Sequence, residues 1–278
     1  MPPGPLRRKW PEVAKRIIFE NELRYHRAMS DPSILILVVA VFLLAGFVKG
    51  VTGLGFPTVS LGILTTVIGL PQAMALMLIP SFATNVWQAA SGGNAKNILR
   101  RIWPFLVAAT LTVWIGAIAL TRLDVWFLSG LLGLLVIIYA LVNLAGYRLS
   151  LSTRQQIWAG PLLGAVNGVL TGMTGSFVVP GVMYLQALGL PRDMLVQSMG
   201  ILFTVSTVAL AFALQVNGLI SADLGATSAI ALIPALIGMV LGRKVRKHLS
   251  EAQFKRIFFF FLLALGFYII VKAAQSFA

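Results

Sequence analysis

Long apolar runs separated by short polar segments fill the chain from residue 34 to residue 274. A helix of about 20 apolar residues crosses a hydrocarbon core, and runs of that length recur in both halves. The expected spans are 34–53, 72–91, 102–121 and 125–146, then 157–175, 194–214, 222–242 and 257–274. Two shorter pieces, 57–69 and 177–189, would each rise only about 20 Å as a helix. We therefore expect them to be broken or re-entrant.

The Gly- and Pro-rich stretch 46–71 returns in the second half as 164–191. Gly50 recurs 118 residues later as Gly168 (168 − 50), and both stretches close with Gly-Leu-Pro. The recurrence predicts an all-α, polytopic membrane protein built from two homologous repeats, each with about four full spans and one short segment. The predicted divisions are an N-terminal segment 1–33, a first repeat 34–146, a linker 147–156 and a second repeat 157–274.

Both copies of the repeated stretch interrupt an apolar run with Gly, Pro and hydroxyl side chains. Such breaks leave backbone amide and carbonyl groups that need other partners, and paired breaks are typical of secondary-transporter binding sites. Exposed amides at a half-helix start favour an anion. The candidate residues are Gly50, Thr52, Gly53, Gly55, Gly168, Thr171, Gly172, Thr174, Gly175 and Ser176. Close helix packing through small residues is the alternative role for these glycines.

Lys49 is the one cation deep inside an apolar run. A lysine at mid-membrane costs about 2.5–3.5 kcal/mol on insertion scales, so it is expected to face a cavity or a partner. The 118-residue offset pairs it with Asn167 (49 + 118), which would supply neutral donors. The alternative is that Lys49 lies nearer a helix end and its amine reaches the interface.

Further polar side chains lie inside apolar runs and could donate to oxygen atoms of a ligand. We include among the candidate binding residues Asn85, Gln186, Gln197 and Thr204. Hydrogen bonding between helices is the alternative role for this group.

Composition narrows the function classes. The chain is 58% hydrophobic and only 11% charged, which identifies a membrane protein rather than a soluble domain. It has no Cys, and its two His lie in charged segments, so we expect no metal and no cofactor. All eight acidic residues lie in tails, loops or at span ends, which disfavours cation transport and favours an anionic substrate. Paired carboxylates and a Ser–His pair are missing, so an enzyme is not expected.

The net charge of +14 comes from cations beside the spans, so we expect anionic membrane lipids, and no nucleic acid, as partners. The segment 1–33 fits a basic amphipathic helix on the cytoplasmic leaflet or a disordered basic tail, with the N-terminus cytoplasmic. Four spans per half would then place the basic loop 243–256 outside, against the positive-inside rule. The side of that loop stays open.

The doubled segment resembles the TauE/SafE family of sulfite exporters. The likeness rests on Lys-Gly-Val-Thr-Gly-Leu-Gly-Phe at 49–56, Gly-Met-Thr-Gly at 172–175 and Tyr-Leu-Gln-Ala-Leu-Gly-Leu-Pro at 184–191. The resemblance implies a bacterial or archaeal inner-membrane permease for sulfite, sulfoacetate or a related organosulfonate, often working outward. The chain departs from many members at Phe56-Pro57 and Ser60, where they have paired glycines and a later proline.

The hypothesis is therefore a permease whose central site lies where the two broken segments meet. An anion channel, a permease for another small anion and a non-transporting membrane scaffold are the alternatives. The direction of transport, the coupling ion and the oligomeric state, a dimer included, stay open.

Overall fold

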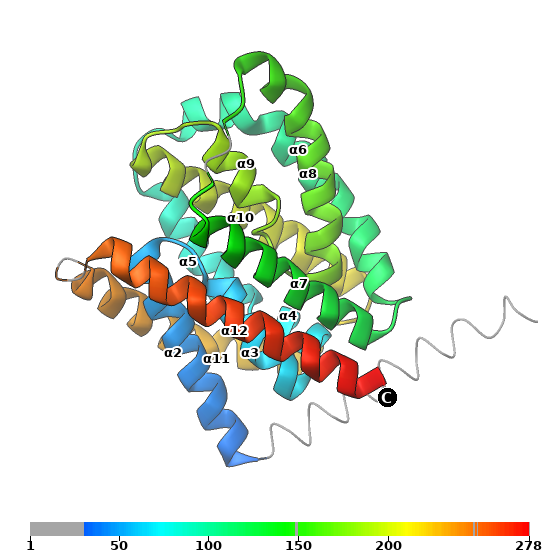
Figure 1. Ribbon diagram of the computed structural model, residues 1–278. Helices are drawn as coiled ribbons and strands as arrows, with labels where there is room; N and C mark the ends of the chain where they lie inside the picture. The colour runs from blue at the N-terminus through cyan, green and yellow to red at the C-terminus, as the bar shows by residue number, and fades with distance from the viewer. Residues whose placement is uncertain (1–30, 148–149, 247, 249, 278) are drawn as a thin grey trace, which may run out of the picture.

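The computed structural model describes residues 31–147, 150–246, 248 and 250–277. The predicted amphipathic segment 1–33 lies almost entirely outside these residues, so it stays a prediction. Within the described residues the chain is all helical, without strands (Figure 1). The helices are α2 (Pro32–Thr52), α3 (Phe56–Ile68), α4 (Leu70–Leu76), α5 (Leu78–Ala90), α6 (Ala95–Leu120), α7 (Val125–Leu144), α8 (Thr153–Thr174), α9 (Gly181–Ala187), α10 (Arg192–Val216), α11 (Ala222–Val245) and α12 (Glu251–Phe277).

Six helices in the described part of the chain are long and apolar enough to cross a membrane, namely α2, α6, α7, α10, α11 and α12. This confirms the prediction of a helical, multi-pass membrane protein. Helix α8 is as long, with 22 residues, but it opens with Thr-Arg-Gln-Gln and is more polar overall. Its Ser152 cap closes a capping box with Gln155, which fixes where the helix begins.

The prediction of one continuous span over 72–91 is wrong, because the segment is divided at Met77 into α4 and α5. Pro80 explains the break, since proline has no amide to donate to the carbonyl four residues before it. The neighbouring amide of Ile79 donates instead to the Ser228 hydroxyl on α11, at 3.2 Å. A tertiary hydrogen bond thus replaces one that the regular helix would have made.

The two short apolar pieces fold differently from each other. Helix α3 has 13 residues, all but its first inside the first piece, and is largely buried. In the second piece only the seven residues of α9 are helical, and they follow an irregular stretch that contains a cis peptide bond between Val179 and Pro180. Both pieces are too short to cross the hydrocarbon core as straight helices, as predicted.

Helices from the two halves pack on each other in a reciprocal way. In Figure 1, α6 and α8 lie side by side at one side of the bundle, α2 lies beside α11 at the other, and α12 runs alongside α7. Helix α5 packs on α10 between these pairs. The first helix of each predicted half therefore packs on the third predicted span of the other.

Glycines make the closest of these contacts. A Cβ on Gly50 would lie 2.3 Å from the carbonyl oxygen of Met239, and one on Gly168 would lie 2.1 Å from that of Ala109. A Cβ on Gly172 would lie 2.2 Å from the Val113 carbonyl oxygen. All three glycines lie inside α2 or α8, so their amides are not exposed at a half-helix start as predicted. Helix packing, the alternative role, accounts for them.

One end of the bundle gathers the loop before α6, the segment before α8, the loop before α10 and the loop before α12. Arg101 donates to the carbonyl oxygen of Leu188 at 2.8 Å, and the Leu151 amide to that of Ala187 at 3.0 Å. The amide of Asn94 donates to the side chain of Gln197 at 3.0 Å. We call this the basic end, because most basic residues of the described loops lie there.

Candidate functional site

Helix α2 ends at a glycine with left-handed backbone. Gly53 has a φ of 80°, and its amide donates to the carbonyl oxygen of Lys49 at 2.7 Å. The Thr52 hydroxyl accepts from the Leu54 amide at 3.1 Å and donates to the carbonyl oxygen of Val48 at 2.9 Å. Thr52 and Gly53 thus stabilise the turn itself, as a helix C-cap does.

Helix α8 ends in the same way. Gly175 has a φ of 71°, and its amide donates to the carbonyl oxygen of Thr171 at 2.8 Å. The Thr174 hydroxyl donates to the Leu170 carbonyl oxygen at 2.7 Å and accepts from the Ser176 amide at 3.3 Å. The Thr171 hydroxyl donates to the Ser176 carbonyl oxygen at 3.1 Å. The hydroxyls of Thr171 and Thr174 therefore have backbone partners at this helix end.

These two helix ends set a different correspondence between the halves from the one read in the sequence. Matching Gly53 to Gly175 gives an offset of 122 (175 − 53), which places Thr171, not Asn167, where Lys49 lies (49 + 122). The alignment of the two halves by sequence is displaced by one helical turn, because α8 has a ladder of glycines every four residues. The packed glycines follow the same register: Gly46 and Gly50 occupy the places of Gly168 and Gly172.

The amine of Lys49 is buried and held by α5. The residue is 3% exposed, so its side chain is enclosed by the protein. Its Nζ donates to the Thr84 hydroxyl at 3.2 Å and to the side-chain oxygen of Asn85. The ring centroid of Phe56, the first residue of α3, lies 6.0 Å from the amine. Among the described residues, the hydrogen-bond partners of the amine are neutral oxygens.

Hydrogen bonds within α5 orient both of these oxygens. The Thr84 hydroxyl donates to the carbonyl oxygen of Pro80 at 2.8 Å, which leaves its lone pairs for the amine. The Asn85 amide nitrogen donates to Ser81 Oγ at 3.1 Å, which turns its oxygen toward Lys49. This hydrogen-bond network fixes which side of the Asn85 amide faces Lys49.

The start of α3 lies next to the amine, since Phe56 is its first residue. Gly55 caps this helix with a φ of 93° and offers no side-chain hydrogen bond. Thr58, in the first turn, is 2% exposed, and its hydroxyl has no hydrogen-bond partner among the described residues. Gly55 is therefore the predicted glycine that does lie at a half-helix start, where the helix dipole is positive.

Asn167 lies at the other break and holds a helix end. It is fully buried, and its side-chain oxygen accepts from the Gly181 amide, at the start of α9, at 2.9 Å. Its side-chain nitrogen has no hydrogen-bond partner in the described structure. The Asn167 side chain therefore accepts from the Gly181 amide, which an anion at the start of α9 would otherwise bind.

Three other candidates are placed apart from Lys49. The Gln197 nitrogen donates to the Ala89 carbonyl oxygen at 2.8 Å, which links α10 to α5. The Thr204 hydroxyl donates to Gly200 within its own helix at 2.8 Å. Gln186 is exposed on α9 and lines a separate cavity. The structure therefore brings Asn85 and Gly55 to Lys49, and leaves these three elsewhere.

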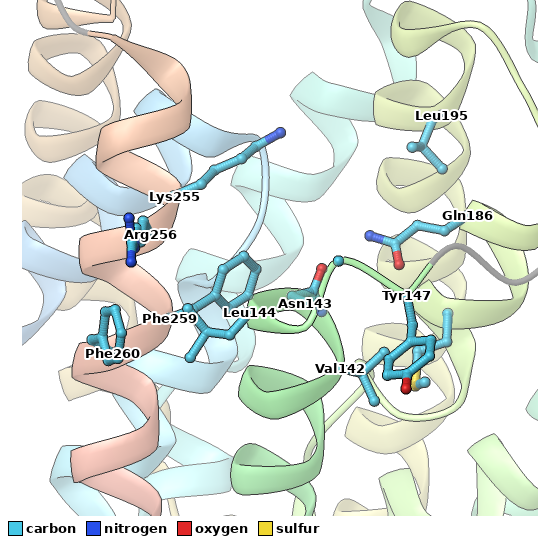
Figure 2. A pocket seen from close by; sticks show the side chains of 12 residues that line it. Val142, Asn143, Leu144, Tyr147, Gln186, Leu195, Lys255, Arg256, Phe259 and Phe260 are labelled. Atoms are coloured by element: carbon cyan, nitrogen blue, oxygen red, sulfur yellow. The ribbon is translucent and has the colours of Figure 1, made fainter.

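The cavity at Gln186 has a volume of about 650 Å³ and lies at the basic end. Lys255 from α12 and Asn143 from α7 line it together with apolar side chains (Figure 2). Figure 2 shows Lys255 extending from α12 toward the side where Gln186 and Leu195 lie.

The family model for the sulfite exporter TauE/SafE matches residues 38–269, most of the chain. The chain belongs to the TauE/SafE sulfite exporter family. The searches of curated proteins and of solved structures returned no match. Members of this family are transporters, not enzymes. The match therefore indicates a multi-pass membrane transporter of anion or sulfite type.

Sequence reasoning left three residues of this TauE/SafE protein out of the candidate site. Thr84 contacts the Lys49 amine, and its match to Thr204 in the second half (84 + 120) was the signal for a role. Thr58 was one hydroxyl among several in the first break. Lys255 was one cation in a basic run, and no sequence pattern showed that it lines a cavity.

Proposed function

We propose that this TauE/SafE protein is a permease that moves a small sulfur-containing anion, such as sulfite, sulfoacetate or another organosulfonate, across the inner membrane, and that the anion binds beside Lys49. The proposed site lies between the Lys49 amine and the start of α3. Its further groups are the Gly55 turn, the Thr58 hydroxyl and the amide of Asn85.

The observation that carries the proposal is the buried amine with neutral partners. Thr84 and Asn85 hold the Lys49 ammonium by hydrogen bonds but leave its charge uncompensated. A buried charge without a counter-ion is costly, so an oxyanion that enters gains both the charge of the amine and the positive end of α3. A cation would meet repulsion at the same place.

We further propose that the two halves are repeats that move against each other around this site. The reciprocal packing of α2 on α11 and of α8 on α6 supports this, as do the matching ends at Gly53 and Gly175. Thr171 holds the position in the second half that Lys49 holds in the first. These two matched positions differ in charge, so the first half provides the cation. Outward movement is the family expectation for the direction.

Flux in proteoliposomes tests the proposal. The purified protein should take up labelled sulfoacetate or sulfite with saturation, and an opposing gradient of unlabelled anion should accelerate exchange. The Lys49→Ala protein should lose this flux, while Lys272→Ala, at the exposed end of α12, should keep it. Absence of wild-type flux would favour a scaffold, and flux without exchange acceleration would favour a channel. Wild-type flux in the Lys49→Ala protein would reject the site.

A further inference from the structure

Charge is distributed unevenly between the two ends of the bundle. The opposite end carries Arg122 and Lys272 beside Asp31, Asp124 and Asp223. The basic end carries Lys96, Arg100, Arg101, Arg154, Arg192, Arg243, Lys244, Arg246, Lys255 and Arg256. Since Lys and Arg are enriched in cytoplasmic loops, the charge of the described loops favours the basic end as the cytoplasmic one, whereas the seven cations of residues 1–30 precede the opposite end.

We propose that the cavity at this end is a cytoplasmic vestibule that binds an organic anion before it reaches Lys49. This inference rests on the proposed function and adds an access side and a second binding position to it. It also places Pro32, where α2 begins, on the outer side, the reverse of the expected cytoplasmic N-terminus. The loop 243–256 then lies inside, as its charge requires.

The polar groups of the cavity come from three helices. Lys255 on α12 provides the cation, Asn143 on α7 and Gln186 on α9 provide amides, and all three line the same space (Figure 2). The Arg256 guanidinium also lines it and lies 6.0 Å from the ring of Phe260. Cations with neutral amides suit an anionic group, and the lining residues that the structure describes include no carboxylate.

The remaining wall is apolar, and this favours an organic anion over an inorganic one. Phe259, Met183 and Leu195 line the cavity beside the polar groups. The volume of about 650 Å³ falls within the range of sites for small organic ligands, roughly 300–1,000 Å³. A sulfonate with a carbon chain can place its charge near Lys255 and its carbon atoms on this wall, whereas sulfite has no apolar part to use it.

The vestibule lies next to the first break. Phe258, the neighbour of the lining residue Phe259, contacts the Gly55 turn, where an added Cβ would lie 2.8 Å from its ring. Val196 follows the lining residue Leu195 and packs on Gly53. Residues of α12 and α10 that adjoin lining residues therefore pack against the turn that begins α3.

Cysteine labelling tests the vestibule without a measurement of transport. The chain has no native Cys, so an introduced Cys is labelled alone. The Gln186→Cys protein should react from the cytoplasmic side with membrane-impermeant methanethiosulfonates. The ratio of its labelling rate with an anionic reagent to its rate with a cationic reagent should be higher than the same ratio for Ser276→Cys, a control at the opposite end. Adding Lys255→Gln should lower the ratio about threefold to fivefold, the size of an exposed charge interaction. An unchanged ratio, or labelling from the outer side, would overturn the proposal.

Measurements of flux distinguish the vestibule from the permease site at Lys49. Lys255→Gln should raise the half-saturating concentration of sulfoacetate about threefold to fivefold at an unchanged maximal rate, and should change that of sulfite less. Lys272→Gln, on the same helix but at the other end, should change neither. Identical half-saturation in the wild type and Lys255→Gln would reject the vestibule while leaving the permease intact. Absence of wild-type flux would reject the permease, and the labelling ratio would still decide the vestibule.

Discussion

The Lys49 amine donates to the side-chain oxygen of Asn85, 36 residues further along the chain. Ser81, one turn before Asn85 on α5, accepts from the other side of the same amide at 3.1 Å. The amide therefore faces the amine with its neutral oxygen, so within the described residues no carboxylate bonds to this amine. This relationship makes the site sensitive to the charge of residue 85.

Substituting Asn85→Asp should weaken anion binding. A carboxylate at this position would neutralise the Lys49 ammonium, so we expect about a tenfold or greater loss of affinity for sulfoacetate. Isothermal titration calorimetry in detergent measures this directly. Asn217→Asp, the same chemical change at the far end of α10, should leave the affinity unchanged. Undiminished binding by the Asn85→Asp protein would place the anion away from Lys49.

The hydrogen bond between Lys49 and Asn85 should appear as a coupling free energy. Asn85→Leu removes the acceptor of a buried ammonium and should lower the free energy of unfolding, whereas the same change in a Lys49→Met background should cost less. Hydrogen bonds to charged groups contribute about 1.5–3 kcal/mol, so the double-mutant cycle should give a coupling of that size. Chemical unfolding in detergent provides the four values. Additive effects would show that the two side chains do not interact.

The glycine ladder on α8 should be intolerant of even one methyl group. Gly168→Ala places a Cβ 2.1 Å from the Ala109 carbonyl oxygen, so α6 and α8 must separate. We expect a loss of about 1–3 kcal/mol in the free energy of unfolding. Gly225→Ala is the matched control, because a Cβ there meets open space within α11. It should gain up to about 1 kcal/mol from helix propensity.

Gln88 should stabilise the end of α2 through two backbone acceptors. Its side-chain nitrogen donates to the carbonyl oxygen of Gly53 at 2.8 Å and to that of Val196 at 2.7 Å. Gln88→Leu leaves both without this donor, at a cost of about 1–3 kcal/mol for each buried group left unpaired. A thermal shift in detergent should show the loss, while exposed Gln275→Leu should change stability by less than about 0.5 kcal/mol. An unaltered melting temperature for Gln88→Leu would mean that other groups hold the break.

The first break illustrates how far the sequence predicts the site. Lys49 could be selected from its position alone, since a lone cation in an apolar run needs a partner. Its partner could not, because the offset of 118 pointed to Asn167, and the helix ends match Lys49 to Thr171 instead. A ladder of glycines spaced by four residues matches itself after a shift of one turn, so only the left-handed caps at Gly53 and Gly175 fix the register.

By itself the sequence determined that the chain is a helical, multi-pass membrane protein with broken segments, because apolar length and Gly/Pro interruptions act locally. It also indicated the family, which the match over residues 38–269 confirmed. The tertiary structure alone decided which interruptions stay inside continuous helices, which neutral oxygens hold the Lys49 amine, and that Lys255 lines a cavity. These depend on contacts between helices distant in sequence, and such contacts leave no periodic signal along the chain.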